Sequence, residues 1–322
     1  MKLRGWIGAG IAAAAVSLSL FNASWIAPKP SGRLIVVAQR GIVQPLRAGA
    51  DPSACAATQI QPPGDNLYIE NSLRSLYKSS RIGADAVEVD VRRSRDGHAV
   101  VFRDDTLNCR TNGQGLLADR TLAELKALDI GYGYTADGGA SFPLRGRGIA
   151  ALPTVEETLR ELRGVQLVFH LRGRDPADAD ALVAGFAGAG AEIGEHHAFY
   201  GDPAVLARLK RIAPRAWTFD PAGLGKCPED YPKLGWLGVV PQSCRHATVG
   251  VPIDGQWTIW GWPYRFLARI AAAGSRVLVY RSRDAGGIQG LDRPEQYDRV
   301  PRAFKGHLFV DDFGTVGPSL RR

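Results

Sequence analysis

Short apolar runs alternate with amphipathic segments along most of the chain. Eight of these runs are rich in Val, Ile, Leu and aromatic residues and have the length of β-strands. The predicted strands are residues 34–38, 86–91, 166–171, 198–200, 216–219, 237–240, 276–280 and 308–310. Between them, apolar residues recur at intervals of three and four, which predicts helices. The predicted helices are residues 71–82, 122–128, 155–162, 177–187, 203–212 and 264–273.

Nearly continuous apolar strands that alternate with helices predict an α/β fold with a parallel sheet covered by helices. Eight strands favour a closed (β/α)8 barrel of the TIM type over an open, doubly wound sheet. No Gly-x-Gly-x-x-Gly pattern follows the first strand, which argues against a dinucleotide-binding fold. Residues 42–68 and 105–153 form long loops that would leave the carboxyl ends of strands, where barrel enzymes build their sites. We therefore expect one barrel domain over residues 31–322.

Residues 1–30 are predicted to be an export segment with a short linker. Lys2 and Arg4 precede an uncharged stretch, residues 5–27, whose most apolar part has the length of a signal peptide. The whole stretch is also long enough to attach the protein to a membrane as an uncleaved helix. Both alternatives place the rest of the chain outside the cytoplasm, either periplasmic or extracellular, or anchored to the membrane.

The four cysteines gain meaning from this expected export, because disulfides persist in oxidising compartments. Three pairings are possible. Cys227 and Cys244 bracket one short segment, which favours that pair, and Cys55 with Cys109 would then join two loops. Buried unpaired thiols are the alternative. No Cys-x-x-Cys pattern supports a zinc site.

The composition fits a globular protein with a large core. The chain has 322 residues, 45% of them hydrophobic, and a formal net charge of +8. Its basic residues form no run that resembles a nucleic-acid-binding arm, so no nucleic-acid partner is expected. A moderate positive charge fits an anionic small molecule and a membrane surface equally well. The oligomeric state is left open.

Three carboxylates stand out as candidate metal ligands. Glu88 and Asp90 lie two residues apart on a predicted strand, so both side chains point to the same face. Their apolar neighbours indicate that this face is the barrel interior. Glu70 opens the first predicted helix and can reach the same mouth, although an acid there also favours the helix dipole. Three carboxylates suit a hard cation such as Ca²⁺ or Mg²⁺.

Arg40 directly follows the first predicted strand. A guanidinium at that position can bind a phosphate through two parallel hydrogen bonds. A salt bridge to Glu88 or Asp90 is the alternative, and it is compatible with the same site.

Several short motifs occur together in a characteristic order. They are Val36-Val37-Ala38-Gln39-Arg40-Gly41, Glu70-Asn71-Ser72, Glu88-Val89-Asp90, Arg103-Asp104-Asp105, Thr111-Asn112-Gly113 and Leu152-Pro153-Thr154. Their order and spacing resemble the glycerophosphodiester phosphodiesterase family over most of the chain beyond the export segment. The resemblance implies a barrel, a divalent cation and hydrolysis of glycerophosphodiesters to an alcohol and glycerol phosphate.

The departures from this family are concentrated in the expected site. Gln39 and Arg103 stand where the family has its two histidines, and neither side chain exchanges a proton near neutral pH. His170 and Arg172 stand where the family has Glu-x-Lys. His170 is the best remaining titrating group in the predicted site, with a satisfied core histidine as the alternative.

Two hypotheses follow from the resemblance and its departures. The first is a metal-dependent phosphodiesterase acting on a small-molecule phosphodiester. Its cation would be held by Glu70, Glu88 and Asp90, its phosphate by Arg40, Arg103 and Arg172. The catalytic positions would be Gln39, Arg40, Arg103 and His170, with His170 as ligand or base. The second is an inactive member of the family that binds a phosphorylated ligand or an envelope component.

Overall fold

The computed structural model describes residues 2–51, 54–63, 65–284 and 287–321. The chain divides into two compact units. Unit 1 consists of Met1–Ile35, Pro221–Gln289 and Glu295–Phe309. Unit 2 consists of Val36–Asp220, Gly290–Pro294 and Val310–Arg322.

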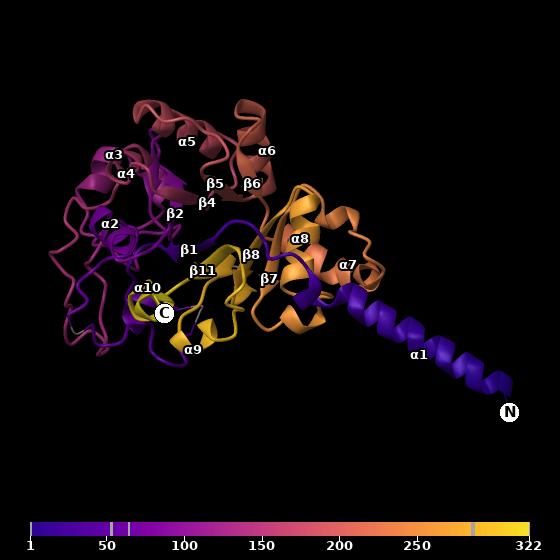
Figure 1. Ribbon diagram of the computed structural model, residues 1–322. Helices are drawn as coiled ribbons and strands as arrows, with labels where there is room; N and C mark the ends of the chain where they lie inside the picture. The colour runs from indigo at the N-terminus through magenta and orange to yellow at the C-terminus, as the bar shows by residue number, and fades with distance from the viewer. Residues whose placement is uncertain (1, 52–53, 64, 285–286, 322) are drawn as a thin grey trace. The chain divides into compact units, whose positions relative to one another are not determined.

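The strands have the order of a nearly closed parallel barrel (Figure 1). The eight parallel strands are β1 (Leu34–Gln39), β2 (Ala86–Arg93), β4 (Gln166–Leu171), β5 (Ala198–Gly201), β6 (Trp217–Phe219), β7 (Thr248–Pro252), β8 (Arg276–Tyr280) and β11 (Gly306–Val310). Their order is β6-β5-β4-β2-β1-β11-β8-β7, so each of the eight strands pairs with the next along the sequence except β6 with β7, where the barrel stays open. This is the predicted (β/α)8 topology. A short strand, β3 (Ala99–Val101), pairs antiparallel with β2.

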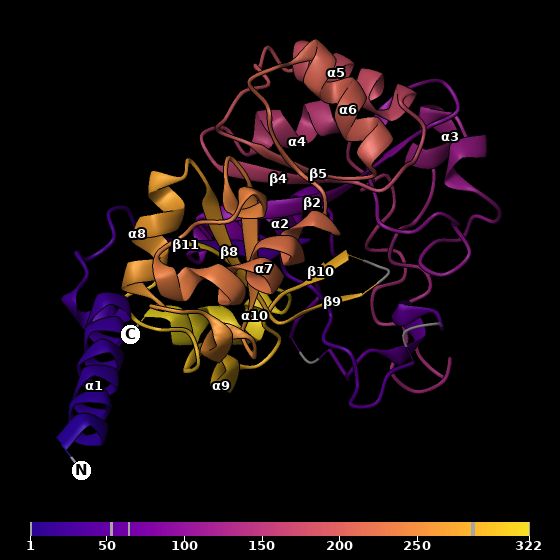
Figure 2. The same cartoon turned by 90° about the vertical axis from the view of Figure 1, so that its right-hand side faces the viewer.

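Helices follow the strands at most of the predicted places. The described helices are α1 (Lys2–Asn22), α2 (Leu73–Arg81), α3 (Leu122–Lys126), α4 (Val155–Glu161), α5 (Ala177–Gly188), α6 (Pro203–Ile212), α7 (Lys226–Leu234), α8 (Tyr264–Ala272), α9 (Pro294–Tyr297) and α10 (Phe313–Val316). In unit 2, α5 and α6 lie side by side over β4 and β5 in both views (Figures 1 and 2). The strand residues beneath them, among them Phe169 and Phe199, are fully buried.

Local sequence determines where several helices of unit 2 begin. Thr121 and Thr154 each cap a helix, and the glutamate three residues later bonds back to the capping residue. Asp202 caps α6 and Pro203 occupies its first turn, as its sequence predicts. Each such cap stabilises its helix by about 1 kcal/mol.

One predicted strand is wrong. Leu237 ends a 3-10 turn, Gly235–Leu237, and the next residue, Gly238, has a φ of 79°, so residues 237–240 do not form a strand. The strand in this part of unit 1 is β7, whose apolar run is interrupted by Gly250 and Pro252. A β-carbon at Gly250 would lie 2.8 Å from both Leu224 and Tyr280, so close packing requires glycine there. Gly250 thus interrupts the apolar pattern by which the sequence would indicate a strand, and close packing is the reason why a glycine stands there.

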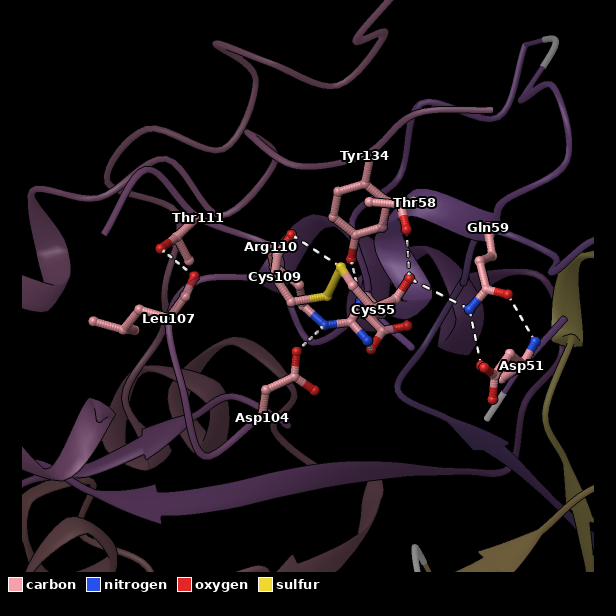
Figure 3. Close-up of a disulfide and its surroundings, with 11 residues drawn as sticks. Asp51, Cys55, Thr58, Gln59, Asp104, Leu107, Cys109, Arg110, Thr111 and Tyr134 are labelled. Atoms are coloured by element: carbon pink, nitrogen blue, oxygen red, sulfur yellow. Dashed lines mark hydrogen bonds and ion pairs between the residues drawn. A yellow bond between two sulfur atoms is a disulfide. The ribbon is translucent and has the colours of Figure 1, made fainter. Parts of the chain in front are cut away.

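The two long loops of unit 2 form a small core of their own. Buried apolar residues from both loops pack together, including Ile60, Leu107 and Ile130. Cys55 and Cys109 form a disulfide against this core (Figure 3). In unit 1, Cys227 and Cys244 form the second disulfide. Both predicted pairings are confirmed.

Loss of the Cys55–Cys109 disulfide should destabilise unit 2 strongly. The bond closes a segment of 54 residues, so it restricts the unfolded chain by about 4 kcal/mol. We expect Cys55→Ser combined with Cys109→Ser to lower the free energy of unfolding in urea by up to about 4 kcal/mol. Thr58→Ser is the matched control, since Thr58 lies exposed beside Cys55. A double variant as stable as the parent would contradict this expectation.

His197 makes the stability of unit 2 sensitive to pH. Its ring packs against Phe169 and Phe186, and its Nδ1 accepts a hydrogen bond from the Leu167 amide at 3.0 Å. Burial, together with the neighbouring His196, lowers the pKa of His197 to about 4. The unfolded chain binds this proton near the ordinary pKa of 6.5. The stabilisation is therefore complete above pH 6.5 and is lost as the pH falls toward 4.

We expect the free energy of unfolding to fall between pH 6.5 and pH 4, with His197 contributing up to about 3 kcal/mol. Urea titrations at several pH values measure this fall. It should shrink in His197→Gln, because a neutral amide can still accept the Leu167 hydrogen bond. It should persist in His98→Gln, since His98 lies in an exposed turn. An unchanged pH profile in His197→Gln would show that His197 titrates normally.

The N-terminal segment forms α1. None of the helices within the described residues combines the length and the apolar character that a membrane span requires. Export and membrane attachment through residues 5–27 stay predictions.

Candidate active site

Polar side chains occupy neighbouring positions on adjacent strands of unit 2. Asp90 on β2 pairs in register with His170 on β4, which pairs with Tyr200 on β5. Glu88 lies two residues before Asp90 and pairs with Gln39 on β1. Because residues paired across parallel strands project to the same side, these side chains form one cluster. All five are buried, so the predicted inward acidic pair is present.

Glu88, Asp90 and His170 form a group that could hold a metal ion. One ligand atom from each lies within 4.8 Å of the others. The His170 Nδ1 atom is 3.2 Å from Asp90 Oδ1 and 3.8 Å from Glu88 Oε1. The Tyr200 hydroxyl donates to Glu88 Oε1 at 2.8 Å, and its ring stacks on His170 with centroids 4.2 Å apart.

Asn71 fixes the position of Asp90. Its Nδ2 donates to Asp90 Oδ2 at 3.0 Å, and its Oδ1 accepts from the Asp90 amide at 3.3 Å. Asn71 has a φ of 61°, in the left-handed region that an asparagine tolerates better than most residues. Sequence reasoning missed Asn71 and Tyr200 as site residues. Asn71 lies in the Glu70-Asn71-Ser72 motif, which is a signal for the site, whereas Tyr200 has only the sequence pattern of an apolar strand residue.

The two buried carboxyls have opposite pKa shifts. Burial and the neighbouring Asp90 charge raise the pKa of Glu88 to about 8. Burial acts in the same direction on Asp90, but the hydrogen bond from His170 and the charge of Arg172 outweigh it and hold the pKa of Asp90 well below its usual range. Burial lowers the pKa of His170. Without a cation, the site therefore keeps one carboxylate protonated at neutral pH and His170 neutral.

A divalent cation fits this group of side chains. Glu88 Oε2 is buried and accepts no hydrogen bond from the described residues. Two carboxylates and a neutral imidazole are a suitable donor set, and a cation between them would relieve their mutual repulsion. The ligands would be Glu88, Asp90 and His170.

Glu70 is held by arginines on two sides. Arg110 lies 3.2 Å from one carboxylate oxygen and Arg40 lies 3.4 Å from the other. Burial would raise the pKa of Glu70, but Arg110 and Arg40 outweigh it and lower the pKa. The described residues bring His170, and not Glu70, into the three-residue group with Glu88 and Asp90. A metal-ligand role for Glu70 stays a prediction, and its contacts favour an ion-pairing role.

Arg40 lies at the centre of the charged network. Its guanidinium contacts Asp311 at 2.6 Å as well as Glu70, and its amide donates to the Glu88 carbonyl. Burial would lower the pKa of Arg40, but Glu70 and Asp311 outweigh this and raise it. Its φ of 60° costs about 1–2 kcal/mol for a residue with a β-carbon. Strain of this kind is concentrated at functional sites.

Arg103 and Arg172 add positive charge beside the cluster. Arg172 lies 3.7 Å from Asp90 Oδ1 and 3.4 Å from His170 Nδ1. The Arg103 guanidinium forms no hydrogen bond or ion pair with the described part of the chain. The charge of Arg40, followed by burial, lowers the pKa of Arg103. Two arginines whose charges repel each other are suited to share an anion.

Gln39 is a structural hydrogen-bonding group. Its side chain is buried, and its Oε1 atom accepts from the Gly290 amide at 2.6 Å. An amide at this position can hold the backbone but cannot transfer a proton.

Arg110 is a further buried residue that sequence reasoning missed. Besides Glu70, it contacts Asp104 at 2.8 Å and the Tyr134 hydroxyl at 2.7 Å. It directly follows Cys109, so the disulfide and the network around Glu70 are neighbours in the chain (Figure 3). No motif or periodicity distinguishes Arg110 from the other arginines of this chain.

Comparison with known families finds one match. Residues 63–172 match the glycerophosphoryl diester phosphodiesterase family. A glycerophosphodiester phosphodiesterase of Caldanaerobacter subterraneus is 44% identical over 72 residues, which is 22% of this chain and 30% of the relative. One of Bacillus subtilis is 32% identical over 101 residues, which is 30% of this chain and 33% of the relative. The matched segments thus span about a third of these relatives.

Solved structures resemble the chain over most of its length. A glycerophosphodiester phosphodiesterase of Agrobacterium tumefaciens has a TM-score of 0.57 at 20% identity, covering 89% of this chain and 99% of its own. A phosphodiesterase of Oleispira antarctica in complex with the product sn-glycerol-3-phosphate has a TM-score of 0.57 at 19% identity, covering 93% of this chain and all of its own. At these identities the likeness concerns the fold.

Proposed function

We propose that this chain, a member of the glycerophosphoryl diester phosphodiesterase family, hydrolyses a glycerophosphodiester or a related phospholipid headgroup with the help of a divalent cation. The observation that carries this proposal is the buried group of Glu88, Asp90 and His170 beside Arg40. Burying two carboxylates this close together is costly unless a cation or a positive ligand group compensates them.

The arginines would bind the phosphodiester. Arg40 is held in place by Glu70 and Asp311, so its remaining donor atoms are oriented before the ligand arrives. Arg103, whose guanidinium has no partner among the described residues, would supply a second contact to the phosphate oxygens. Arg172 would offset further negative charge from its position next to His170.

Glu88, Asp90 and His170 would hold the cation, with Ca²⁺ and Mg²⁺ as the candidates. When bound, a divalent cation stabilises negative charge that develops on phosphoryl oxygens. Asn71 and Tyr200 orient two of these ligands through hydrogen bonds, which is the usual role of groups behind a metal site.

The site has few side chains that can transfer a proton. Gln39 and Arg103 occupy the positions at which the family has histidines, and neither group can exchange a proton near neutral pH. His170 is the remaining imidazole of the cluster, and its Nδ1 is engaged with Asp90. General acid–base assistance contributes about 10²–10⁴-fold to a rate, so turnover should be slow.

An inactive phosphate-binding protein is the second candidate. The same two replacements, Gln39 and Arg103, favour it. In that case Arg40 and Arg103 would bind a phosphorylated ligand or envelope component without cleaving it.

We also propose that the protein works outside the cytoplasm. The two disulfides support this, because such bonds persist in oxidising compartments. The apolar stretch of residues 5–27 would direct export or attach the protein to the membrane.

The decisive experiment measures release of glycerol phosphate from a panel of glycerophosphodiesters by the purified full chain. The enzyme is first stripped with a chelator and then supplied with Ca²⁺ or Mg²⁺. Hydrolysis restored by one cation supports the first candidate. Binding of glycerol 3-phosphate without any hydrolysis supports the second, and failure to bind or cleave would reject both.

A further inference from the structure

Most tryptophans of this chain lie at its surface. Of seven tryptophans, five are exposed, namely Trp6, Trp25, Trp236, Trp257 and Trp260. The exposed fractions are 78, 76, 36, 86 and 44%, respectively. All five belong to unit 1. Indole rings have large apolar surfaces that proteins usually cover, and a group of exposed ones indicates an interaction surface.

Three of these rings, Trp25, Trp236 and Trp260, belong to segments that meet at the end of α1, and Trp257 precedes Trp260 by three residues. Ser24, next to Trp25, accepts a hydrogen bond from the Tyr264 amide at the start of α8. Asn22 donates to the Trp236 carbonyl at 2.8 Å. Figures 1 and 2 both place this end of α1 beside α8. We call Trp25, Trp236, Trp257 and Trp260 the tryptophan face.

Two rings of the tryptophan face are fixed by their indole nitrogens. Trp236 donates to the Lys233 carbonyl at 3.0 Å, and Trp260 donates to the Pro232 carbonyl at 3.1 Å. Both contacts are to the end of α7. Trp257 lies in the 3-10 turn just before Trp260. The polar atoms of Trp236 and Trp260 are thus satisfied within the protein, and the exposed parts of these rings are mainly apolar.

Positive charge is concentrated in the same unit. Unit 1 contains fifteen Lys and Arg residues against six Asp and Glu, a formal charge of +9. Unit 2 contains twenty-five against twenty-six, a formal charge of −1. Unit 1 therefore accounts for the entire positive excess of the chain. The first 35 residues contain Lys2, Arg4, Lys29 and Arg33 and no Asp or Glu.

Apolar surface continues from the tryptophan face along α1. Val16, Leu20 and Phe21 of this helix are exposed. The Arg269 guanidinium of α8 lies 5.1 Å from the centre of the Phe21 ring, which joins the two surfaces. Tryptophan next to basic side chains is typical of the boundary between a membrane and water, where each group meets its preferred environment.

We propose that unit 1 binds the surface of an anionic phospholipid bilayer through the tryptophan face. The indole rings would lie at the level of the lipid headgroups, and the basic side chains of the unit would contact the lipid phosphates. The charge of +9 and the adjoining apolar helix favour a lipid surface over a second protein. The proposal does not depend on hydrolysis.

The test is sedimentation of the full chain with phospholipid vesicles. One set contains phosphatidylcholine alone, and the other contains phosphatidylcholine mixed with phosphatidylglycerol. We expect the parent to bind the anionic vesicles, and the binding to weaken as salt is raised. Trp257→Ser should weaken binding about tenfold, since one large apolar side chain no longer enters the interface. Trp257→Phe should retain most of it.

Ile149→Ser is the matched control, because Ile149 is 64% exposed in unit 2. It should bind vesicles like the parent. Trp260→Ser is a second variant, to be used if Trp257→Ser does not fold. Parental binding by both tryptophan variants would assign lipid attachment to α1 alone and overturn the proposal. Equal binding of the parent to neutral and anionic vesicles would also overturn the proposal. The same holds if the parent forms a dimer without lipid and Trp257→Ser dissociates this dimer while vesicle binding is unchanged.

Discussion

Replacing Gln39 and Arg103 together by histidine should raise phosphodiesterase activity at least about 100-fold above that of the parent. The parent retains the proposed cation ligands and Arg40, so its binding of a phosphodiester is expected to survive. It lacks one group to accept a proton from the attacking water and one to protonate the leaving alcohol. Imidazoles at both positions titrate near neutral pH and supply these two groups.

One hydrogen bond of Gln39 can survive this change. A neutral imidazole can accept the hydrogen bond that Gln39 Oε1 now receives from the Gly290 amide. Loss of Arg103 should weaken substrate binding. We therefore expect the double variant to have a higher kcat and also a higher KM than the parent. Each single variant should gain little, because the other proton transfer still limits the rate. Steady-state kinetics of the parent, the two single variants and the double variant, with and without a chelator, measure kcat and KM. A folded, cation-binding double variant no faster than its parent would contradict the explanation.

Replacing Glu88 by glutamine should abolish cation binding and lower any phosphodiesterase activity by about 100-fold or more. The change preserves shape but removes the carboxylate whose Oε2 atom is buried without a hydrogen-bond donor among the described residues. Calorimetric titration with Ca²⁺ and Mg²⁺ measures the binding, and release of glycerol phosphate measures the activity. Glu192→Gln is the matched control, because Glu192 is exposed in the same unit.

Glu70→Gln distinguishes the two possible ligand sets. If Glu88, Asp90 and His170 are the ligands, Glu70→Gln should leave cation affinity nearly unchanged and should weaken phosphate binding, because Arg40 loses a partner that orients it. A loss of cation affinity as large as that of Glu88→Gln would restore Glu70 to the ligand set. Parental cation binding by Glu88→Gln would show that the cation site lies elsewhere.

The general architecture could be predicted from the sequence because its signals are local. Seven of the eight strands follow from apolar spacing, and the start of α6 follows from Asp202 and Pro203. Glu88 and Asp90 were also predictable, since two residues apart on a buried strand must share a face. The disulfide pairs followed from an even cysteine count and one short spacing.

Strand β7 was missed for a packing reason. Gly250 interrupts the apolar run, yet the space beside it is filled by Leu224 and Tyr280 from other segments. No pattern within the run itself can report how close those segments come.

The ion pairs and exposures were decided by the tertiary structure. Sequence spacing allowed Glu70 to approach a metal or an arginine, and the fold shows that Arg40 and Arg110 lie beside it. His170 became the partner of Asp90 because parallel register aligns β2 with β4 across a gap of 80 residues in the chain. Likewise, the apolar character of Trp257 predicts burial, and only the packed structure leaves it 86% exposed. Periodicity therefore determines which face a residue takes within its own element, whereas distances between elements select its partners.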